Sequence, residues 1–381
     1  MLDRRRYLCN ACGKTFLEPV PDLDVKRLMT VRLVEYVRTR CRQVTFAKLA
    51  RDVGVDDQTI RNIFQDHVAV LRATTHFVTP EVLGLDEVKV IGRSRAVLTN
   101  IERRTLFDLL EDRNKKTLIR YFNELPDRHR VRCLVMDMWS VYRQVADTCF
   151  RGVPVVIDRF HVERMANDAL ERVRKAVRKR LTVRQRLKLK DDRHLLLAAF
   201  ARLTPIQQRT CQEWFRTYPI LGHAHAAKER FAEIYQAPSR AVAEARFDHW
   251  AARLEVDVQP YFQELLQAVG NRRVDVFDYF DFPITNAYTE SVNNLIKLEN
   301  RMGRGYSFEV LRARMLYDLN ARKDGSTSVR RRATVPIRPR RPRGGLFDLV
   351  GEAAGLPRAR IAQIDEIVEY GPYIPTLVRM L

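Results

Sequence analysis

The sequence lacks any apolar run of about 18 residues or more, so it predicts no helix that spans a membrane. Its first residues, MLDRRRYLCN, hold no apolar stretch of the kind that a signal peptide needs. Cysteine is scarce as well: six cysteines in 381 residues are too few for a disulfide framework and favour the reducing cytoplasm. No internal repeat is present. We therefore expect a cytoplasmic protein of two or three domains.

Acidic residues are outnumbered by basic ones, with 47 Asp and Glu against 68 Lys and Arg and a formal net charge of +21. An excess this large favours a polyanionic partner, most simply nucleic acid. Residues 171–190 are especially rich in Arg and Lys. Such a run is often only a solvated helix face, but here few acids balance it, so we favour phosphate contacts. The residues expected to make them are Arg174, Lys175, Arg178 and Lys179.

Residues 1–20 contain half of a zinc-binding motif. Cys9 and Cys12 form a Cys-x-x-Cys pair followed by Gly13, which is typical of the knuckle of a zinc ribbon. A structural zinc site needs four ligands, and no other Cys or His precedes Cys41. The segment is therefore either a zinc-binding knuckle or one whose second half was lost or lies upstream of the given start.

Residues 21–75 carry a pattern typical of a helix-turn-helix domain. We expect a basic amphipathic helix over 24–42, a short helix, a turn at Gly54, and a helix that Asp57 caps and that runs through His67. This last helix is the candidate recognition helix. Its groove-facing residues would be Gln58, Thr59, Arg61 and Asn62. A plain helical hairpin would give the same pattern, but the net charge favours DNA binding.

Residues 80–165 change in character. LGLDEVKV, SRAVLTNIE and TLFDLLED predict three strands joined by turns, and a helix follows near 115–124. The continuous apolar runs VRCLVMD and VPVVID predict buried strands, with a helix near 140–149 between them. The order β-β-β-α-β-α-β fits an α/β protein with an RNase H-like, mixed five-stranded sheet.

The rest of the chain is expected to be helical or without regular structure. Residues 166–280 predict a helical insertion, and residues 281–323 an acidic helix followed by another helix. We interpret residues 324–345 as a basic linker and 346–381 as a C-terminal segment. The aromatic residues of the insertion suit a hydrophobic core better than stacking on an extruded base; they include Trp214, Phe215, Tyr218, Phe231, Tyr235, Phe247 and Trp250.

Carboxylates stand at the ends of the buried strands and on the acidic helix. Asp86 and Asp137 end apolar runs, and Glu290 lies at the centre of TNAYTESVNNLIK, residues 285–297, where Thr285 and Asn286 are suitable N-cap residues. An Asp at a strand end is often only a turn residue, and a single Glu is often only solvated. Three carboxylates that meet at one sheet edge, however, repel one another unless a cation neutralises them.

Hard oxygen ligands of this kind select Mg²⁺ or Mn²⁺. Two such ions, about 4 Å apart, would activate a water or a 3′-hydroxyl and stabilise the leaving oxygen of a phosphodiester. The pattern therefore predicts phosphoryl transfer on DNA.

Several polar residues are expected around these carboxylates. Asp158 ends the last apolar run, where we favour capping of the next helix, or pairing with Arg159 or Arg164, over metal ligation. His161 could assist proton transfer, but a capping or buried role is favoured. Asn294 and Lys297 share a helix face with Glu290. The full expected set is Asp158, His161, Asn286, Asn294 and Lys297.

The segments LGLDEV, VMDMW and DRFHV (158–162), and above all TNAYTESVNNLIKLENRMGRGYSFEVLRARML, resemble insertion-sequence transposases of the ISL-three group, in the DDE superfamily. The acidic-helix motif of that group is approximately S-N-G-x-x-E-x-x-N-x-x-I-K, then Arg, Gly, and Tyr or Phe. Thr285 and Ala287 replace its Ser and Gly. The matching residues are Asn286, Glu290, Asn293 or Asn294, Ile296, Lys297, Arg301 and Gly305.

The resemblance covers residues 7–320 and implies an RNase H-like catalytic domain with Asp86, Asp137 and Glu290 as its metal-binding triad. It implies two Mg²⁺ or Mn²⁺ ions, and it makes the helices before the acidic helix an insertion. Members of the group commonly begin with a zinc ribbon and a helix-turn-helix, which would place Zn²⁺ at Cys9 and Cys12.

The sequence thus predicts a bacterial, nucleoid-associated DNA transposase that binds terminal inverted repeats, cleaves them by metal-activated hydrolysis and joins the ends by transesterification. It would act as a homo-oligomer on double-stranded DNA, because two ends must be brought together. One alternative is a non-catalytic DNA-binding regulator derived from a transposase. Another is an RNase H-like nuclease, which the helix-turn-helix disfavours because the narrow major groove of A-form RNA does not admit a helix.

Overall fold

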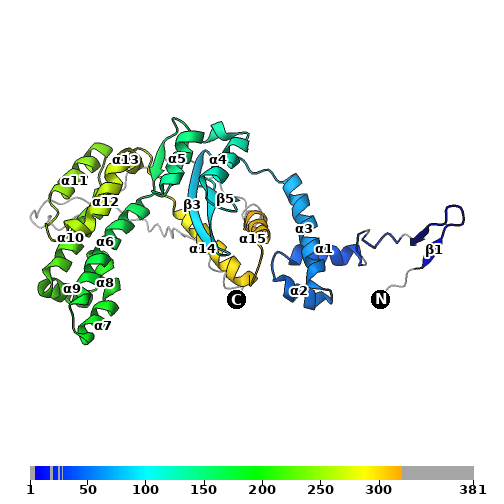
Figure 1. The fold of residues 1–381 in the computed structure, drawn as a ribbon, viewed down its shortest axis with the longest axis horizontal. Helices are drawn as coiled ribbons and strands as arrows, with labels where there is room; N and C mark the ends of the chain where they lie inside the picture. Colours follow the sequence, from blue (N-terminus) through cyan, green and yellow to red (C-terminus); the bar gives the residue numbers. More distant parts are fainter. Residues whose placement is uncertain (1–4, 18–19, 25, 28, 320–381) are drawn as a thin grey trace, which may run out of the picture. The chain divides into compact units, whose positions relative to one another are not determined.

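The computed structural model describes residues 5–17, 20–24, 26–27 and 29–319 (Figure 1). The expected linker over 324–345 and C-terminal segment over 346–381 lie outside the described residues. At the N-terminus, β1 (Arg6–Leu8) and β2 (Thr15–Leu17) pair as an antiparallel hairpin. None of the helices that the structure describes is long and apolar enough to cross a membrane.

The predicted N-terminal helical region is present. Its helices are α1 (Val31–Arg40), α2 (Phe46–Val53) and α3 (Asp57–Thr74). Gly54 ends α2 with φ = 71°, a left-handed conformation that glycine adopts without strain. Two boundaries differ from the prediction. The first helix begins at Val31 rather than at residue 24, and the N-cap of α3 is Asp56 rather than Asp57, because the Asp56 side chain accepts the Thr59 N–H bond.

A mixed five-stranded sheet follows, as predicted. The strands are β3 (Val82–Val90), β4 (Arg93–Asn100), β5 (Thr105–Leu109), β6 (Cys133–Met136) and β7 (Val155–Ile157). Their spatial order is β5-β4-β3-β6-β7. The three N-terminal strands run antiparallel, whereas β6 is parallel to β3 and β7 is parallel to β6. Because parallel neighbours need crossovers, helices join them: α4 (Lys115–Glu124), with the 3₁₀ turn η1 (Arg128–Arg130), and α5 (Ser140–Cys149).

Both faces of the sheet are covered, which explains why its central strands are apolar without alternation. Leu83 and Leu85 point to the face that α4 and α5 cover. Val88 and Val90, of opposite parity, join a second cluster with side chains of α14 (Ala287–Gly303) and α15 (Phe308–Arg314). A π-helical stretch, η3 (Met315–Leu319), continues α15. Figure 1 shows α14 lying along β3.

Between β7 and α14 the chain is helical. The helices are α6 (Arg159–Lys179), α7 (Val183–Asp191), α8 (Arg193–Leu197), α9 (Pro205–Thr217), α10 (Pro219–Ile234), α11 (Arg240–Ala252), α12 (Gln259–Asn271) and α13 (Arg273–Asp281), with the 3₁₀ turn η2 (Phe200–Arg202). We call residues 159–281 the helical segment.

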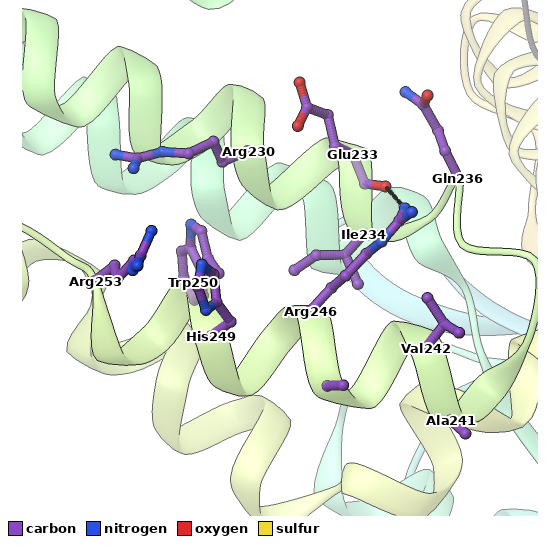
Figure 2. A pocket seen from close by; sticks show the side chains of 11 residues that line it. Arg230, Glu233, Ile234, Gln236, Ala241, Val242, Arg246, His249, Trp250 and Arg253 are labelled. Atoms are coloured by element: carbon purple, nitrogen blue, oxygen red, sulfur yellow. Dashed lines mark hydrogen bonds between the residues drawn. The ribbon is translucent and has the colours of Figure 1, made fainter.

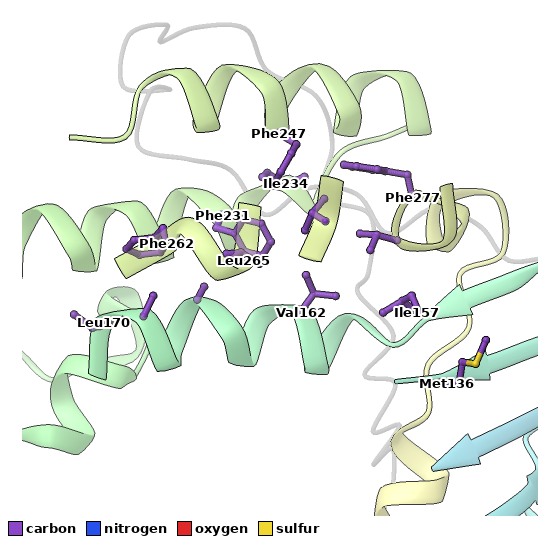
Figure 3. Close-up of a cluster of buried hydrophobic side chains, with 14 of the residues drawn as sticks. Met136, Ile157, Val162, Leu170, Phe231, Ile234, Phe247, Phe262, Leu265 and Phe277 are labelled. Carbon is purple, nitrogen blue, oxygen red and sulfur yellow. The ribbon is translucent and has the colours of Figure 1, made fainter. Parts of the chain in front are cut away.

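The core of the helical segment is continuous with the core of the sheet. In Figure 3, Val162 of α6, Phe231 of α10 and Phe262 of α12 pack together, with Ile157 of β7 beyond them. The aromatic residues predicted to form this core are buried or half-buried. Trp250 shows why base stacking is not needed to explain them, because it is buried and its Nε1 donates to the Ala227 carbonyl.

One buried histidine makes the stability of this segment depend on pH. His225 on α10 is 4% exposed, and its Nε2 has no hydrogen-bond partner among the described residues. Burial, assisted by the positive charge of Lys228, lowers the pKa of His225 to about 4. The unfolded chain binds this proton with a pKa of about 6.5. The folded state therefore loses stability as the pH falls from about 6.5 towards 4.

We expect the free energy of unfolding to fall by about 2 kcal/mol between about pH 7 and about pH 5 through this group alone. His225→Gln should remove that part of the pH dependence, measured by urea unfolding at both pH values. His129→Gln, which replaces an exposed histidine, serves as the control and should keep the wild-type dependence. Equal pH dependence in all three proteins would contradict the assignment.

Candidate active site

Three aspartates lie next to one another at one edge of the sheet. Asp86, Asp137 and Asp158 each directly follow the last residue of a parallel-paired stretch, and those residues are in register: Leu85, Met136 and Ile157. Asp86 and Asp158 are buried, whereas Asp137 is half-buried. The register thus brings together carboxylates that are about 50 and 20 residues apart in the sequence.

These carboxylates influence one another electrostatically. The pKa of Asp86 is raised to about 6, mainly by burial and to a smaller extent by the charges of Asp137 and Asp158, against the opposing effects of the Glu87 N–H and of His161. Burial is also the main reason why the pKa values of Asp137 and Asp158 are raised. A positive charge on His161 lowers all three. His161 therefore lies within electrostatic reach of the whole cluster.

The acidic helix α14 is held against this edge by a face of buried polar side chains. Asn286, Thr289 and Asn293 are spaced three and four apart, so they share one side of the helix. The Asn286 side chain donates to the Leu85 carbonyl at 3.4 Å. Thr289 Oγ1 lies 2.6 Å from Thr99 Oγ1 on β4. Polar groups of α14 therefore bond directly to the two central antiparallel strands.

Asn293 contacts Asp86 itself. Its Nδ2 donates to Asp86 Oδ2 at 2.9 Å and to the Glu87 carbonyl at 3.1 Å, while Asp86 Oδ1 accepts from the Glu87 N–H at 2.7 Å. The sequence had left open whether Asn293 or Asn294 matches the motif, and the structure distinguishes them because Asn294 is exposed. Asn293 thus fixes the orientation of the Asp86 carboxylate.

Gly84 explains how α14 comes so close to β3. A Cβ at this position would lie 2.8 Å from Asn286 Oδ1 and would also clash with Thr99 of β4 and with Ile101, just after that strand. Only glycine leaves room for the first turn of the helix. The LGLDEV segment thus supplies both the glycine that admits the helix and the aspartate that the helix holds.

Glu290 follows Thr289 on α14 and is exposed, with Asn294 and Lys297 also exposed on its face. Its charge contributes to the raised pKa of Asp158, so Glu290 lies within electrostatic reach of that carboxylate. The backbone N–H of Asn286 lowers the pKa of Asp158, so the starts of α14 and α6 lie near each other. Asn286 is the N-cap of α14, as its residue type suggested, but its side chain bonds to β3 instead of capping the helix.

Asp158 is the N-cap of α6, and its Oδ1 accepts from the Phe160 N–H at 3.4 Å. This is the capping role favoured from the sequence. No sequence pattern pointed to Arg113, which lies in the loop before α4. Its guanidinium stacks 3.9 Å from the centre of the Trp139 ring, pairs with Glu87, and lowers the pKa of Asp137. A lone arginine in a loop carries no pattern that would have identified it.

A metal ion is not part of the structure, and the part of the chain that it describes holds no group of three or more His, Cys, Asp or Glu side chains already arranged around a metal position. Cys9 and Cys12 lie at the turn of the N-terminal hairpin. The backbone N–H of Cys12 lowers the pKa of Cys9, which favours a thiolate. With two thiols and no accompanying ligands among the described residues, a zinc site gains no support.

The four residues of α3 that were predicted to contact DNA differ from one another in exposure and in hydrogen-bond partners. Gln58 and Asn62 are exposed on α3 and bond to each other at 2.9 Å. Arg61 is half-buried, and its Nε donates to Asp57 at 2.7 Å. Thr59 Oγ1 bonds to the capping residue Asp56. Gln58 and Asn62 are therefore the most accessible members of the set.

The basic set on α6 needs one correction. Arg174 is 4% exposed; its guanidinium bonds to both Glu171 oxygens and to the Leu189 carbonyl. It holds α7 against α6 and is not available to a phosphate. Lys175 and Lys179 are exposed and Arg178 is half-buried, so these three remain candidates for DNA contacts.

Comparison with protein-family models gives two matches. Residues 83–315, more than half of the chain, match a model described as a transposase, that of the DDE transposases of family ISL3. Residues 18–68 match a model described as the helix-turn-helix domain of transposase family ISL3. No curated protein matches the chain. The first match spans all three aspartates and Glu290, and the second spans the turn at Gly54.

The contact between Asn293 and Asp86 yields a test by isosteric substitution. Asn293→Asp replaces the amide donor by a carboxylate and buries it against Asp86. We expect the free energy of unfolding to fall by about 3 kcal/mol at neutral pH, because a buried charge loses its partner and gains a repulsive one. Asn294→Asp makes the same change on the exposed side of α14 and should cost about 0.5 kcal/mol or less. Urea unfolding without added metal measures both, and equal effects would contradict the assignment.

Proposed function

The chain belongs to the ISL3 family of DDE transposases, and from this premise we propose that it cleaves the ends of an insertion sequence and joins them to target DNA through Asp86, Asp137 and Glu290. The observation that carries the proposal is the register that sets Asp86 and Asp137 side by side, with α14 held against the same edge. We further propose that the sheet and its helices form an RNase H-like core, which the strand order β5-β4-β3-β6-β7 supports.

The chemistry of these donors fits a divalent cation. DDE transposases generally use divalent metal ions, and the groups here are carboxylates, the hard oxygen ligands that suit Mg²⁺ or Mn²⁺. The raised pKa values of Asp86 and Asp137 also support cation binding, because buried carboxylates that repel one another need a neutralising charge. Bound there, a pair of such ions would activate the attacking oxygen and stabilise the leaving oxygen of a phosphodiester.

The residues of the chain itself would orient this site. Asn293 holds one Asp86 oxygen, so that the carboxylate keeps a single orientation as the substrate binds. The bond from the Asn286 side chain to the Leu85 carbonyl holds the start of α14 against β3 and therefore positions Glu290. The positive charge of Arg113 offsets part of the negative charge at the strand ends. Asn294 and Lys297 are exposed beside Glu290, where they could contact the DNA strand being cut.

DNA recognition is assigned to the helix-turn-helix domain, with α3 as the recognition helix in the major groove of a terminal inverted repeat. Asn and Gln are the side chains that read adenine through paired hydrogen bonds. Gln58 and Asn62 are exposed on α3 and already oriented by their mutual bond. Because a transposase must hold two ends together, we expect at least two copies of the chain on the DNA.

The catalytic proposal is tested on a supercoiled plasmid that carries the element's own ends, with Mg²⁺ or Mn²⁺. Glu290→Gln keeps the shape of the side chain and removes its charge. We expect its cleavage rate to fall at least about 100-fold, which corresponds to about 3 kcal/mol of transition-state stabilisation, with binding to the ends retained. Glu102→Gln removes an exposed carboxylate outside the site and should cleave at the wild-type rate.

Cleavage by Glu290→Gln at the wild-type rate would refute the assignment of Glu290. A wild-type protein that binds the ends but never cuts them with either metal would favour the alternative of a non-catalytic DNA-binding regulator.

Recognition is tested separately by Asn62→Ala. We expect affinity for an end duplex to fall by about 1–3 kcal/mol, because a base contact is lost, while affinity for an unrelated duplex stays unchanged. Competition binding at one fixed salt concentration measures both affinities. An equal loss on the two duplexes would indicate a phosphate contact or a folding defect, and would contradict a role in base recognition.

A further inference from the structure

A hollow of about 820 Å³ opens between α10 and α11 in the helical segment (Figure 2). Its floor includes Ile234 and the buried Trp250. Basic side chains stand around it: Arg230 from α10, Arg246 and His249 from α11, and Arg253, the C-cap residue directly after α11. Neither the helix-turn-helix domain nor the acidic sheet edge includes any of these residues.

The arginines around this hollow have no acidic partners. Arg230, Arg246 and Arg253 are all exposed, and none forms an ion pair with a carboxylate in the described part of the chain. Arg230 Nε donates to the Ala226 carbonyl and Arg246 Nη1 to the Glu233 carbonyl, both at 3.3 Å. These backbone bonds orient two of the guanidinium groups without neutralising them.

Other arginines of the helical segment do pair with carboxylates. Arg240, at the start of α11, pairs with Glu244 and with Asp278 of α13. Arg273 of α13 pairs with Asp248 of α11. The carboxylates of α11 therefore form ion pairs on the side of the helix that packs against α13. The opposite side of α11 keeps its positive charge.

Glu233 is the one acidic residue in the lining. Figure 2 shows its carboxylate directed away from the Arg246 guanidinium, and only its backbone carbonyl meets Arg246. The net charge of the hollow is therefore positive. Among the described residues, this surface has no anionic partner.

The spacing of the arginines suits a nucleic-acid backbone. Arg246 on α11 and Arg253 at its C-cap are seven residues apart, which is about 10 Å along the helix axis. One strand of duplex DNA rises about 3.4 Å per nucleotide, so this separation corresponds to about three nucleotides. Arg230 faces the same hollow from α10 (Figure 2), where it could reach a neighbouring phosphate.

We propose that the hollow between α10 and α11 binds the sugar–phosphate backbone of duplex DNA, as a second contact separate from the helix-turn-helix domain. Guanidinium groups bind phosphate oxygens in pairs of hydrogen bonds, so the contact is electrostatic and independent of sequence. The inference requires that the chain bind DNA, as its family does. It does not depend on the proposed catalytic triad, and a failure of cleavage would leave it standing.

The test replaces three exposed arginines together, Arg230→Ala, Arg246→Ala and Arg253→Ala, in the full-length chain. A matched control changes three other exposed arginines that form no ion pair with a described residue: Arg93→Ala, Arg103→Ala and Arg151→Ala. Both variants lose three positive charges. The probe is a duplex of the element's own end with its flanking DNA, titrated over a range of salt concentrations and footprinted with hydroxyl radicals.

We expect the slope of log K against log salt concentration to become less steep by about two to three units in the first variant, close to one for each lost phosphate contact. Its footprint should lose one patch of backbone protection while the region covered by the helix-turn-helix remains protected. A third variant with all three arginines changed to Lys should keep most of the slope, since Lys retains the charge.

An unchanged slope and footprint in the alanine variant would overturn the proposal. So would an equal change in the control, because that would show a general effect of net charge. A change in self-association without any change in the footprint would assign the hollow to a second copy of the chain instead.

Discussion

The candidate site depends on the close contact between α14 and β3. Gly84 leaves the space for it, and Asn286, Thr289 and Asn293 fill that space with side chains that bond to the strands. Buried polar groups without partners destabilise a protein, so such an interface fits in only one arrangement. An apolar helix face could slide by a turn at small cost, whereas this one would lose several bonds at once. The polar interface thus defines where Glu290 stands relative to Asp86.

The same contact explains how a set of mutually repelling carboxylates persists. Desolvation raises the pKa values of Asp86, Asp137 and Asp158, so this sheet edge destabilises the folded chain at neutral pH when it is ionised. The surrounding core compensates for that cost through the clusters on both faces of the sheet. If these ionised carboxylates destabilise the fold until a cation binds, as the proposed function requires, the cation binds tightly because it relieves their repulsion.

Sequence patterns predicted the sheet well because its strands are strongly apolar and sharply bounded by turns. Asp86, Asp137 and Glu290 could be selected for the same reason, since each follows or interrupts an apolar pattern. From the sequence, either Asn293 or Asn294 could match the motif, because both are asparagines. Only the structure shows which of the two is buried. Arg113 could not be predicted because its partners Trp139 and Glu87 lie in other elements, and the burial of Arg174 could not be predicted because it depends on how α7 packs against α6.

The helical segment shows a further limit of reasoning from charge along the sequence. The densest basic run, on α6 and α7, contains an arginine that the fold uses internally, and Arg174 is buried against Glu171. The hollow between α10 and α11 stands out less in the sequence, because acidic residues are interspersed with its arginines. Only the structure shows that Glu244 and Asp248 pair with Arg273 of α13 and leave the other side of α11 positive. Unneutralised charge in three dimensions, more than charge density along the chain, is therefore the property that identifies a surface suited to DNA.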